Sequence, residues 1–370
     1  MNRISSLLLL ACLSLAGCQN SNCNYPIYRF ADRMHPPVDL TNTRAPAARG
    51  VEDALASRLQ SEWVRLQDDQ AIEHLAIAVS GPAGDWSSPM PDGVERFYWA
   101  SVGKLATAVL LQQLAQENRL RLDQRLSRWY PTLPGADNIT LEMVLSHRAG
   151  FASHNGFDAF RQRGSPATPE DVARFLEARP LLFCPGTDWY YSNSGYVLLG
   201  RIIEQVTGES FSAAVATRIA EPIGASSLAA LVQGESPPDV APARPPGSSE
   251  PPMAPGDPFS AGNIVASPQD MVRFLAAVLD GRLVPGAALN AMGRNLYPMF
   301  DQRLYYGLGL MVYDLPETTW VGHSGGTPGA KAVVAYSMVK STYAAVALTG
   351  EGSAESIARL FMSTVEAPAI

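Results

Sequence analysis

Apolar residues recur at two different spacings along the chain, and the order of these spacings predicts the fold. Residues 51–67 carry leucines and a tryptophan near helical spacing, which predicts a helix with one buried face. Short apolar runs at residues 75–79 and 94–99 predict buried strands. Residues 102–114 are apolar on nearly every side, as in a helix enclosed by the rest of a domain.

N-cap patterns predict where two later helices begin. Thr168 and Ser267 are each followed by a proline and, three residues on, by an aspartate, the order expected of a helix N-cap. Near the C-terminus, apolar runs predict three strands joined by short turns, at residues 320–321, 332–336 and 343–348. A closing helix is predicted at residues 354–365, with Ser353 as its cap.

Strands at both ends of the chain with helices between them indicate an α+β domain. We expect this domain to span residues 51–368, with its sheet built from both chain ends and a helical and loop insert at about residues 120–300. Residues 237–258 hold nine prolines and cannot form regular structure, so we expect a long surface loop or flap there. Residues 18–50 contain Pro and Asn without periodicity and predict a tether.

The first 17 residues predict a targeting segment. Arg3 gives a positive start, and the apolar run at residues 4–15 is too short to span a bilayer. The segment closes on Leu15-Ala16-Gly17-Cys18, which resembles the lipobox of bacterial lipoproteins. The resemblance implies cleavage before Cys18 and a lipid anchor on it. Gln19 resembles the outer-membrane sorting pattern, so we expect a periplasm-facing protein; an ordinary secretory signal is the alternative.

Composition and charge narrow the function classes. The 370 residues carry a net charge of −7 and no basic stripe, so nucleic-acid binding lacks electrostatic support. Of the four cysteines, Cys12 leaves with the signal and Cys18 would be lipidated. A disulfide between Cys23 and Cys184 is compatible with an exported protein, and two free thiols are an equally good interpretation.

Ser101 and Lys104 are the first candidate catalytic residues. Only three of the 28 basic residues are lysines, and Lys104 lies one helical turn after Ser101 at the predicted start of a buried helix. A desolvated lysine can lose its proton and activate a neighbouring serine, which an arginine cannot do. Ser337 and Lys340 repeat the spacing, but in a predicted strand, where the two side chains would point to opposite faces.

Two further motifs follow in order, Tyr191-Ser192-Asn193 and His323-Ser324-Gly325. With S-x-x-K at Ser101, they resemble the serine β-lactamase and penicillin-binding superfamily, closest to the branch of class C β-lactamases, D-alanyl-D-alanine carboxypeptidases and family VIII esterases. The likeness runs from about residue 51 to the C-terminus and includes a leucine–histidine–glycine loop at residues 145–150. It implies a β-lactamase/transpeptidase-like fold, an antiparallel sheet flanked by helices with an all-helical insert.

The resemblance also implies roles for single residues. Ser101 is the nucleophile, and either Lys104 or Tyr191 removes its proton. Asn193 would donate to Lys104 or to a substrate amide. Backbone N–H groups of Ser101 and Gly326 would form the oxyanion hole. The members expected to bind substrate are Asn193, His323, Ser324, Gly325 and Gly326.

Two competing interpretations fail on the sequence. Residues 322–326 match the G-x-S-x-G elbow of α/β-hydrolases, but a strand and hairpin follow Ser324, and no histidine comes later. The five histidines have no spacing typical of a metal site, so we predict neither a metal nor a cofactor.

His323 stands where class C β-lactamases mostly have lysine, a permanent cation for a substrate carboxylate. This weakens the β-lactamase alternative. We expect a small-molecule or peptidoglycan-peptide substrate, and His323 to bind its carboxylate when protonated, near and below about pH 6.5. The favoured activity is D,D-carboxypeptidase-like; the alternatives are an esterase, a weak β-lactamase, or a penicillin-binding sensor that is acylated without turnover.

Overall fold

The computed structural model describes residues 33–69, 71–161, 165–244, 247, 253–300 and 303–366. The predicted signal segment, Cys18 and Cys23 lie outside these residues. Cys184 is half-buried and has no disulfide partner within the part of the chain that the structure describes.

An eight-stranded sheet forms the centre of the domain, and every neighbouring pair of its strands is antiparallel. Strands from the two ends of the chain meet where β1 pairs with β11, as the sequence predicts. The order across the sheet is β2 (Gly84–Ser87), β1 (Ile72–Gly81), β11 (Thr342–Gly350), β10 (Ala330–Ser337), β9 (Thr319–Thr327), β8 (Met311–Asp314), β7 (Leu304–Tyr306) and β6 (Tyr297–Pro298).

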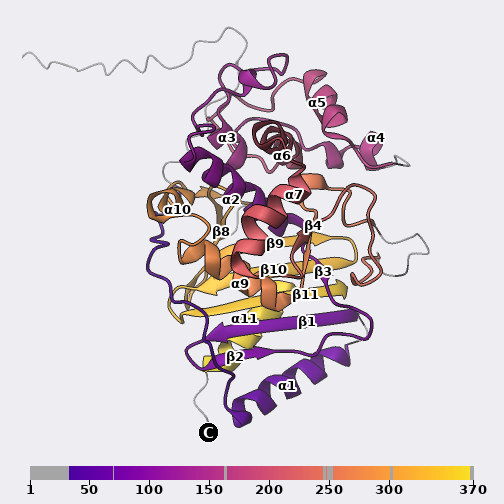
Figure 1. Cartoon of the computed structure of the whole chain (residues 1–370), viewed down its shortest axis with the longest axis vertical. Helices are drawn as coiled ribbons and strands as arrows, with labels where there is room; N and C mark the ends of the chain where they lie inside the picture. The colour runs from indigo at the N-terminus through magenta and orange to yellow at the C-terminus, as the bar shows by residue number, and fades with distance from the viewer. Residues whose placement is uncertain are drawn as a thin grey trace, which may run out of the picture.

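Helices cover both faces of the sheet (Figure 1). Successive side chains of β11 alternate between the two faces: Val346 and Leu348 pack on one, and Ala345 and Ala347 on the other. Helices α1 (Asp53–Gln67) and α11 (Ala354–Glu366) cover the first face. Helix α9 (Pro268–Leu279) covers the second, and the same core continues into α2 (Gly103–Gln116).

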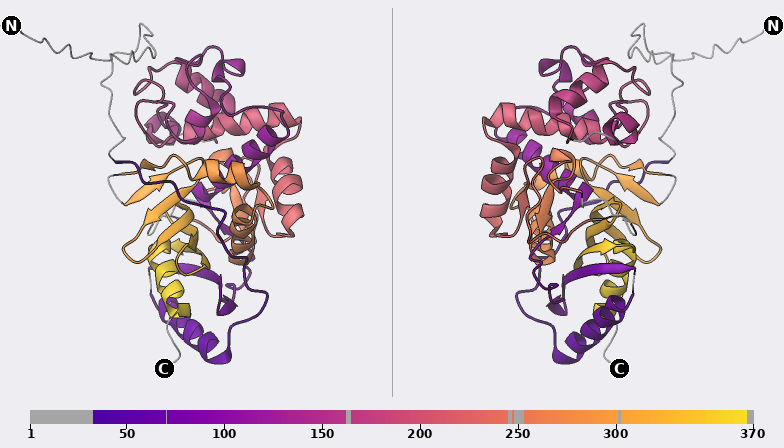
Figure 2. Two further views of the ribbon diagram at one scale, coloured as in Figure 1. Left: turned by 90° about the vertical axis from the view of Figure 1, so that its left-hand side faces the viewer. Right: turned by 90° about the vertical axis from the view of Figure 1, so that its right-hand side faces the viewer.

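Four helices gather beyond one end of the sheet, at the top of both views in Figure 2: α3 (Leu141–Leu145), α4 (Asp158–Arg161), α5 (Pro169–Glu177) and α6 (Asn193–Thr207). The helices α7 (Phe211–Val215), α8 (Glu221–Ile223) and α10 (Gly286–Met292) lie lower, where α8 contacts α9. Single turns of 3₁₀ helix are η2 (Ala100–Val102), η3 (Leu126–Arg128), η4 (His154–Gly156) and η6 (Phe259–Ala261), and Ala216–Ala220 form a π-turn, η5. A small second sheet has the order β3 (Phe97–Tyr98), β5 (Ile264–Ala266) and β4 (Ala229–Ala230).

The predicted helix starts are confirmed. Thr168 forms a full capping box with Asp171, and the Ser267 hydroxyl accepts the N–H of Asp270 at 3.3 Å. The strand predicted at residues 94–99 is too long, since only Phe97 and Tyr98 pair in the sheet. The preceding backbone bonds to the Pro-rich segment instead: the N–H groups of residues 95 and 96 both donate to the carbonyl of Asp239.

Part of the predicted tether belongs to the domain. From residue 33 onward the chain packs along the sheet and helices, and Leu40 is fully buried in the core. The backbone of Arg44 donates to the Tyr336 hydroxyl at 3.0 Å and accepts from the Tyr343 hydroxyl at 2.8 Å. The tether prediction over residues 18–50 is therefore too long, because single anchor contacts of this kind leave no periodicity in a sequence.

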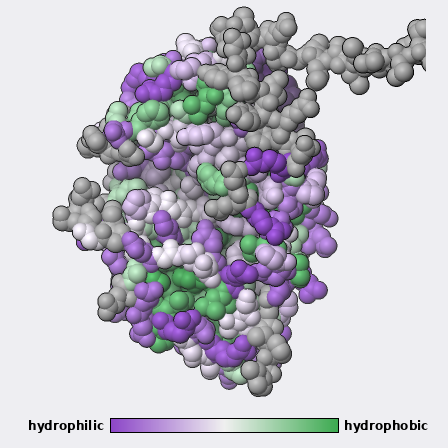
Figure 3. Space-filling view, turned by 180° about the vertical axis from the view of Figure 1, so that it is seen from behind, coloured by the Kyte–Doolittle hydropathy of each residue, from purple (hydrophilic) through white to green (hydrophobic). Residues whose placement is uncertain are grey.

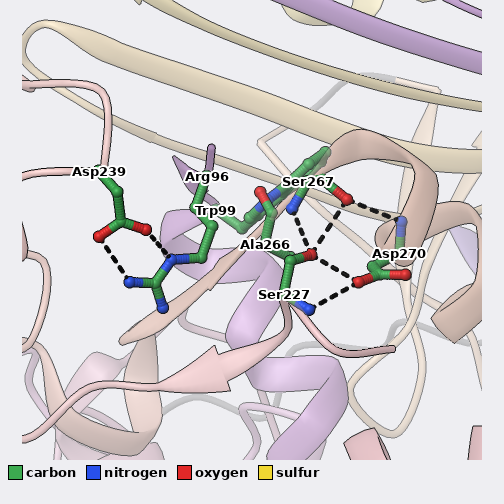
Figure 4. Close-up of polar contacts among 7 residues, drawn as sticks. All are labelled: Arg96, Trp99, Ser227, Asp239, Ala266, Ser267 and Asp270. Carbon is green, nitrogen blue, oxygen red and sulfur yellow. Dashed lines mark hydrogen bonds and ion pairs between the residues drawn. The ribbon is translucent and has the colours of Figure 1, made fainter. Parts of the chain in front are cut away.

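The described part of the Pro-rich segment contains neither helix nor strand, as its prolines predict. It is tied to the domain by an ion pair, in which Arg96 contacts Asp239 at 2.6 Å (Figure 4). This pair fixes the start of the segment beside β3.

No helix within the described ranges is both long and apolar enough to cross a membrane. Hydrophobic side chains on the face seen in Figure 3 form separate groups among polar ones. Exposed apolar groups of this scattered kind need no partner to explain them.

Candidate active site

Ser101 lies in the tight turn η2, between strand β3 and helix α2. The turn is held by Trp99, whose backbone N–H donates to the carbonyl of Ile264 and whose indole N–H donates to that of Ala266, both at 3.0 Å. Ala100 adopts a φ of +47°, a strained conformation for a residue with a side chain. The strained turn leaves Ser101 partly exposed at the start of the buried helix.

Lys104 lies directly beneath Ser101 and is completely buried. Its Nζ is hydrogen-bonded to the Ser101 Oγ at 3.1 Å and donates to the carbonyl of Ala261 at 2.6 Å. Burial in a low-dielectric interior disfavours the ammonium form and lowers the pKa of Lys104 well below its usual value. A neutral amine at this distance can accept the serine proton.

Tyr191 borders the same two residues. Its ring centroid lies 4.9 Å from the Lys104 Nζ, and its hydroxyl is buried without a hydrogen bond of normal geometry to the described residues. Burial raises the pKa of Tyr191, and the neighbouring Ser101 hydroxyl offsets only part of that effect. The phenol therefore stays protonated near neutral pH, so Lys104 is the better candidate for the base that the sequence left open, with Tyr191 able to pass a proton onward.

Strand β9 brings Gly325 against the turn that carries Ser101. A side chain at Gly325 would place its Cβ 2.4 Å from the carbonyl oxygen of Trp99 and 2.6 Å from the backbone nitrogen of Ser101. Only glycine permits this approach. Gly326, the next residue, lines the same cavity as Ser101, so both residues of the predicted oxyanion hole border one cavity.

His323 does not lie where its predicted role requires. The ring is completely buried, its Nδ1–H donates to the Ser324 carbonyl at 2.6 Å, and its Nε2 lies 3.2 Å from the Tyr306 hydroxyl. Burial, and next the charge of Lys104, lowers the pKa of His323 to about 3. The prediction that His323 supplies a cation for a substrate carboxylate near pH 6.5 is therefore wrong, because the ring packs inward and stays neutral.

The other predicted substrate-binding residues divide between two faces of β9 and the start of α6. Asn193 begins α6 and lines the cavity beside Ser101. The Ser324 hydroxyl lies 3.7 Å from the Met311 sulfur and is absent from the cavity lining. The expectation that Ser324 contacts substrate has no support in this arrangement, because its hydroxyl packs against Met311 outside the cavity.

The cavity in front of Ser101 has a volume of about 460 Å³. Its wall includes several residues that sequence reasoning missed. Asp257 and Met253 come from the Pro-rich segment, His154 from η4, and Thr327 from the end of β9. Burial lowers the pKa of His154 to about 4, and Asp257, whose pKa burial raises, is the one lining residue in the described ranges with an acidic side chain. No motif marks these residues, because they reach the site through long-range packing.

Comparison with known proteins decides the family. The beta-lactamase family model matches residues 65–367. The chain belongs to the beta-lactamase family. Among the described residues, this member has no group of three or more histidine, cysteine or acidic side chains placed to hold a metal ion.

Relatives within the beta-lactamase family differ in the reactions that their names record. The chain is 28% identical to penicillin-binding protein 4 of Amycolatopsis lactamdurans over 267 residues, 63% of this chain and 66% of that protein. It is 33% identical to the lovastatin esterase of Penicillium rubens over 150 residues, 34% of this chain and 37% of that protein. The chain thus spans less than two thirds of the length of these two relatives.

Among solved structures, a D-stereospecific amidohydrolase from a Streptomyces species is similar over nearly its whole length. The TM-score is 0.68 at 26% identity, and the match covers 80% of this chain and 93% of that one. The sequence prediction of the superfamily and of a helix-flanked antiparallel sheet is confirmed.

Proposed function

We propose that this protein is a serine hydrolase that works through an acyl-enzyme on Ser101. The observation that carries the proposal is the 3.1 Å contact between the Ser101 Oγ and the Nζ of a completely buried lysine. Lys104 takes the hydroxyl proton while the Oγ forms a bond to the substrate carbonyl carbon. Backbone N–H groups at Ser101 and Gly326 receive the negative charge on the carbonyl oxygen.

The remaining steps need a proton for the leaving group and then a water molecule that hydrolyses the acyl-enzyme. When the tetrahedral intermediate collapses, the proton on Lys104 passes to the leaving group, directly or through the Tyr191 hydroxyl, and the bond to the leaving group breaks. Water then attacks the acyl carbon and gives its proton to Lys104. The bond between the Ser101 Oγ and the acyl carbon then breaks, Lys104 returns its proton to the Oγ, and the carboxylic acid leaves.

For the substrate class, the site favours a neutral acyl ester or amide. A substrate carboxylate would find no cation at His323, which is buried and neutral, and it would lie near the acidic Asp257 in the cavity lining. D,D-carboxypeptidase-like cleavage of peptidoglycan peptides is the second candidate. Similarity to penicillin-binding protein 4 supports it, as does the predicted export to a lipid anchor at Cys18. The esterase alternative is supported by the similarity to lovastatin esterase.

Labelling by a fluorophosphonate probe tests the nucleophile. Ser101→Ala should abolish labelling, while Ser324→Ala should keep most of it, since Ser324 faces Met311 rather than the cavity. Loss of labelling in Ser324→Ala with retention in Ser101→Ala would refute the assignment.

Substrate preference is tested by comparing p-nitrophenyl acetate with a D-Ala-D-Ala peptide and a fluorescent penicillin. Ester turnover without peptide turnover supports the first candidate, and peptide turnover supports the second. A penicillin adduct that is stable, without turnover of either substrate, would replace both with a penicillin-binding sensor. A transient penicillin adduct that is hydrolysed would indicate the weak β-lactamase.

A further inference from the structure

His147 occupies a position that is strained for its residue type. It follows α3, where its N–H donates to the carbonyl of Val144 at 3.2 Å and the N–H of Arg148 donates to that of Met143 at 2.7 Å. These two hydrogen bonds form a Schellman motif at the end of the helix. The position that His147 occupies in this motif is usually glycine or asparagine. His147 has a φ of +60°, so the chain keeps a side chain here against the local preference.

The side chain and backbone of His147 hold both neighbours of Tyr191. The ring Nδ1 accepts the N–H of Ser192 at 3.1 Å, and the backbone carbonyl accepts the N–H of Tyr190 at 3.0 Å. The ring itself packs against the Tyr191 ring, with centroids 4.3 Å apart. One buried residue thus fixes the backbone on either side of Tyr191 and one face of its ring.

His147 is neutral in this setting. Because Nδ1 accepts a hydrogen bond, the single ring proton lies on Nε2, which is buried and has no partner in the described part of the chain. Burial first, and then repulsion from the positive charges that Lys104 and His323 carry when protonated, hold the pKa of His147 well below its usual value. The ring is also enclosed by Trp189, Tyr196 and Tyr306. A neutral ring adds no positive charge that would compete with proton uptake by Lys104.

We propose that His147 is the positioning residue for Tyr191. It sets the distance of the Tyr191 hydroxyl from Ser101 chiefly through the Ser192 N–H bond, and the ring contact adds a smaller contribution. This inference rests on the proposed serine hydrolase function, in which Tyr191 passes a proton. The competing interpretation is a core histidine whose loss would only lower stability.

Two nearly isosteric substitutions separate these interpretations. His147→Asn places an amide oxygen near the position of Nδ1 and tolerates the positive φ, so it can still accept the Ser192 N–H. The leucine side chain of His147→Leu is close in shape to the asparagine side chain but has no hydrogen-bond acceptor. We expect His147→Leu to slow acylation of Ser101 by a fluorophosphonate about tenfold or more, and His147→Asn to stay within about threefold of wild type.

A double-mutant cycle with Tyr191→Phe supplies a readout that stability alone would not move. If His147 acts through the Tyr191 hydroxyl, His147→Leu should cost little further rate once that hydroxyl is gone. His74→Asn is the control, since His74 in β1 bonds to Thr349 at 2.9 Å and lies outside the site. Thermal unfolding of each variant gives the stability effect separately.

The outcomes are distinct. Two results overturn the positioning role and leave the proposed hydrolase function standing. In the first, His147→Leu lowers the acylation rate equally in the wild-type and Tyr191→Phe backgrounds. In the second, His147→Asn is acylated no faster than His147→Leu. If the fluorophosphonate does not label Ser101 in the wild-type protein, the proposed hydrolase function itself is refuted. If His147→Leu fails to fold, a folded His147→Asn with a normal rate still supports the proposal, and a slow or unfolded one overturns it.

Discussion

Replacing Lys104 by methionine should make the protein more stable near neutral pH while destroying its reactivity. The completely buried amine resists protonation, although the unfolded chain would bind that proton below the ordinary lysine pKa of 10.5. Since the unfolded state then holds more protons, wild-type stability falls as the pH falls below 10.5, until the folded pKa is reached.

The magnitude follows from the contacts of Lys104. Each pH unit below 10.5 costs about 1.4 kcal/mol, so a lysine still neutral at pH 7 costs about 5 kcal/mol. Methionine removes that cost but leaves the Ala261 carbonyl, now bonded at 2.6 Å, without its donor, a loss of about 1–3 kcal/mol. Lys104→Met should therefore gain about 2–4 kcal/mol at pH 7.

Urea unfolding at several pH values between about 6 and 10 measures the effect. The advantage of Lys104→Met should shrink by about 1.4 kcal/mol per pH unit as the pH rises, and should reverse between about pH 8.5 and 10, where the remaining cost of the neutral lysine falls below that of the lost hydrogen bond. Lys331→Met, in a partly exposed position of β10, is the control and should follow the wild-type slope. A difference between Lys104→Met and wild type that does not vary with pH would mean that the folded protein holds the ammonium form, and would refute the neutral-base argument.

Three further predictions follow from the structure. Gly325→Ala should lower Ser101 labelling by about 100-fold or more, because its Cβ would lie 2.6 Å from the Ser101 nitrogen, whereas Gly286→Ala in open space should change nothing. The KM for a D-Ala-D-Ala peptide should show no His323 titration between about pH 5.5 and 8; a rise in KM centred near pH 6.5 would show an accessible imidazole. Cys18→Ser should release the protein from membranes in a fractionation assay, and unchanged membrane association would refute the lipid anchor.

Local geometry explains why part of the site could be predicted from the sequence. Residues three apart share one helix face, so the pairing of Ser101 with Lys104 needs no knowledge of the rest of the chain. The strands β10 and β11 could be recognised because each is a compact apolar run between turn residues. The sequence predicts strand β9 only at residues 320–321, because its remaining residues, as far as Thr327, are mostly glycine and polar.

Burial depth and the approach of distant segments could not be predicted in the same way. Whether His323 faces substrate depends on Tyr306, which pairs into the sheet at β7 and lies against the imidazole. Asp257 reaches the cavity only because the Pro-rich segment folds back along β3, and nothing periodic in its sequence specifies that path. The strain at His147 also depends on a helix end that the sequence analysis did not locate.

The neutral state of Lys104 is a property of the whole enclosure rather than of one neighbour. Burial is the dominant cause of its lowered pKa, and the positive charge it would carry is one reason why His147 and His323 also stay neutral. The three groups compete for protons, so protonating one makes protonation of the other two harder. Since burial keeps the pKa of His323 at about 3 and that of His147 well below its usual value, the loss of activity at low pH should follow the protonation of Lys104. A substitution that opens the enclosure to water would then shift the acid limb of the activity profile upward without touching Ser101.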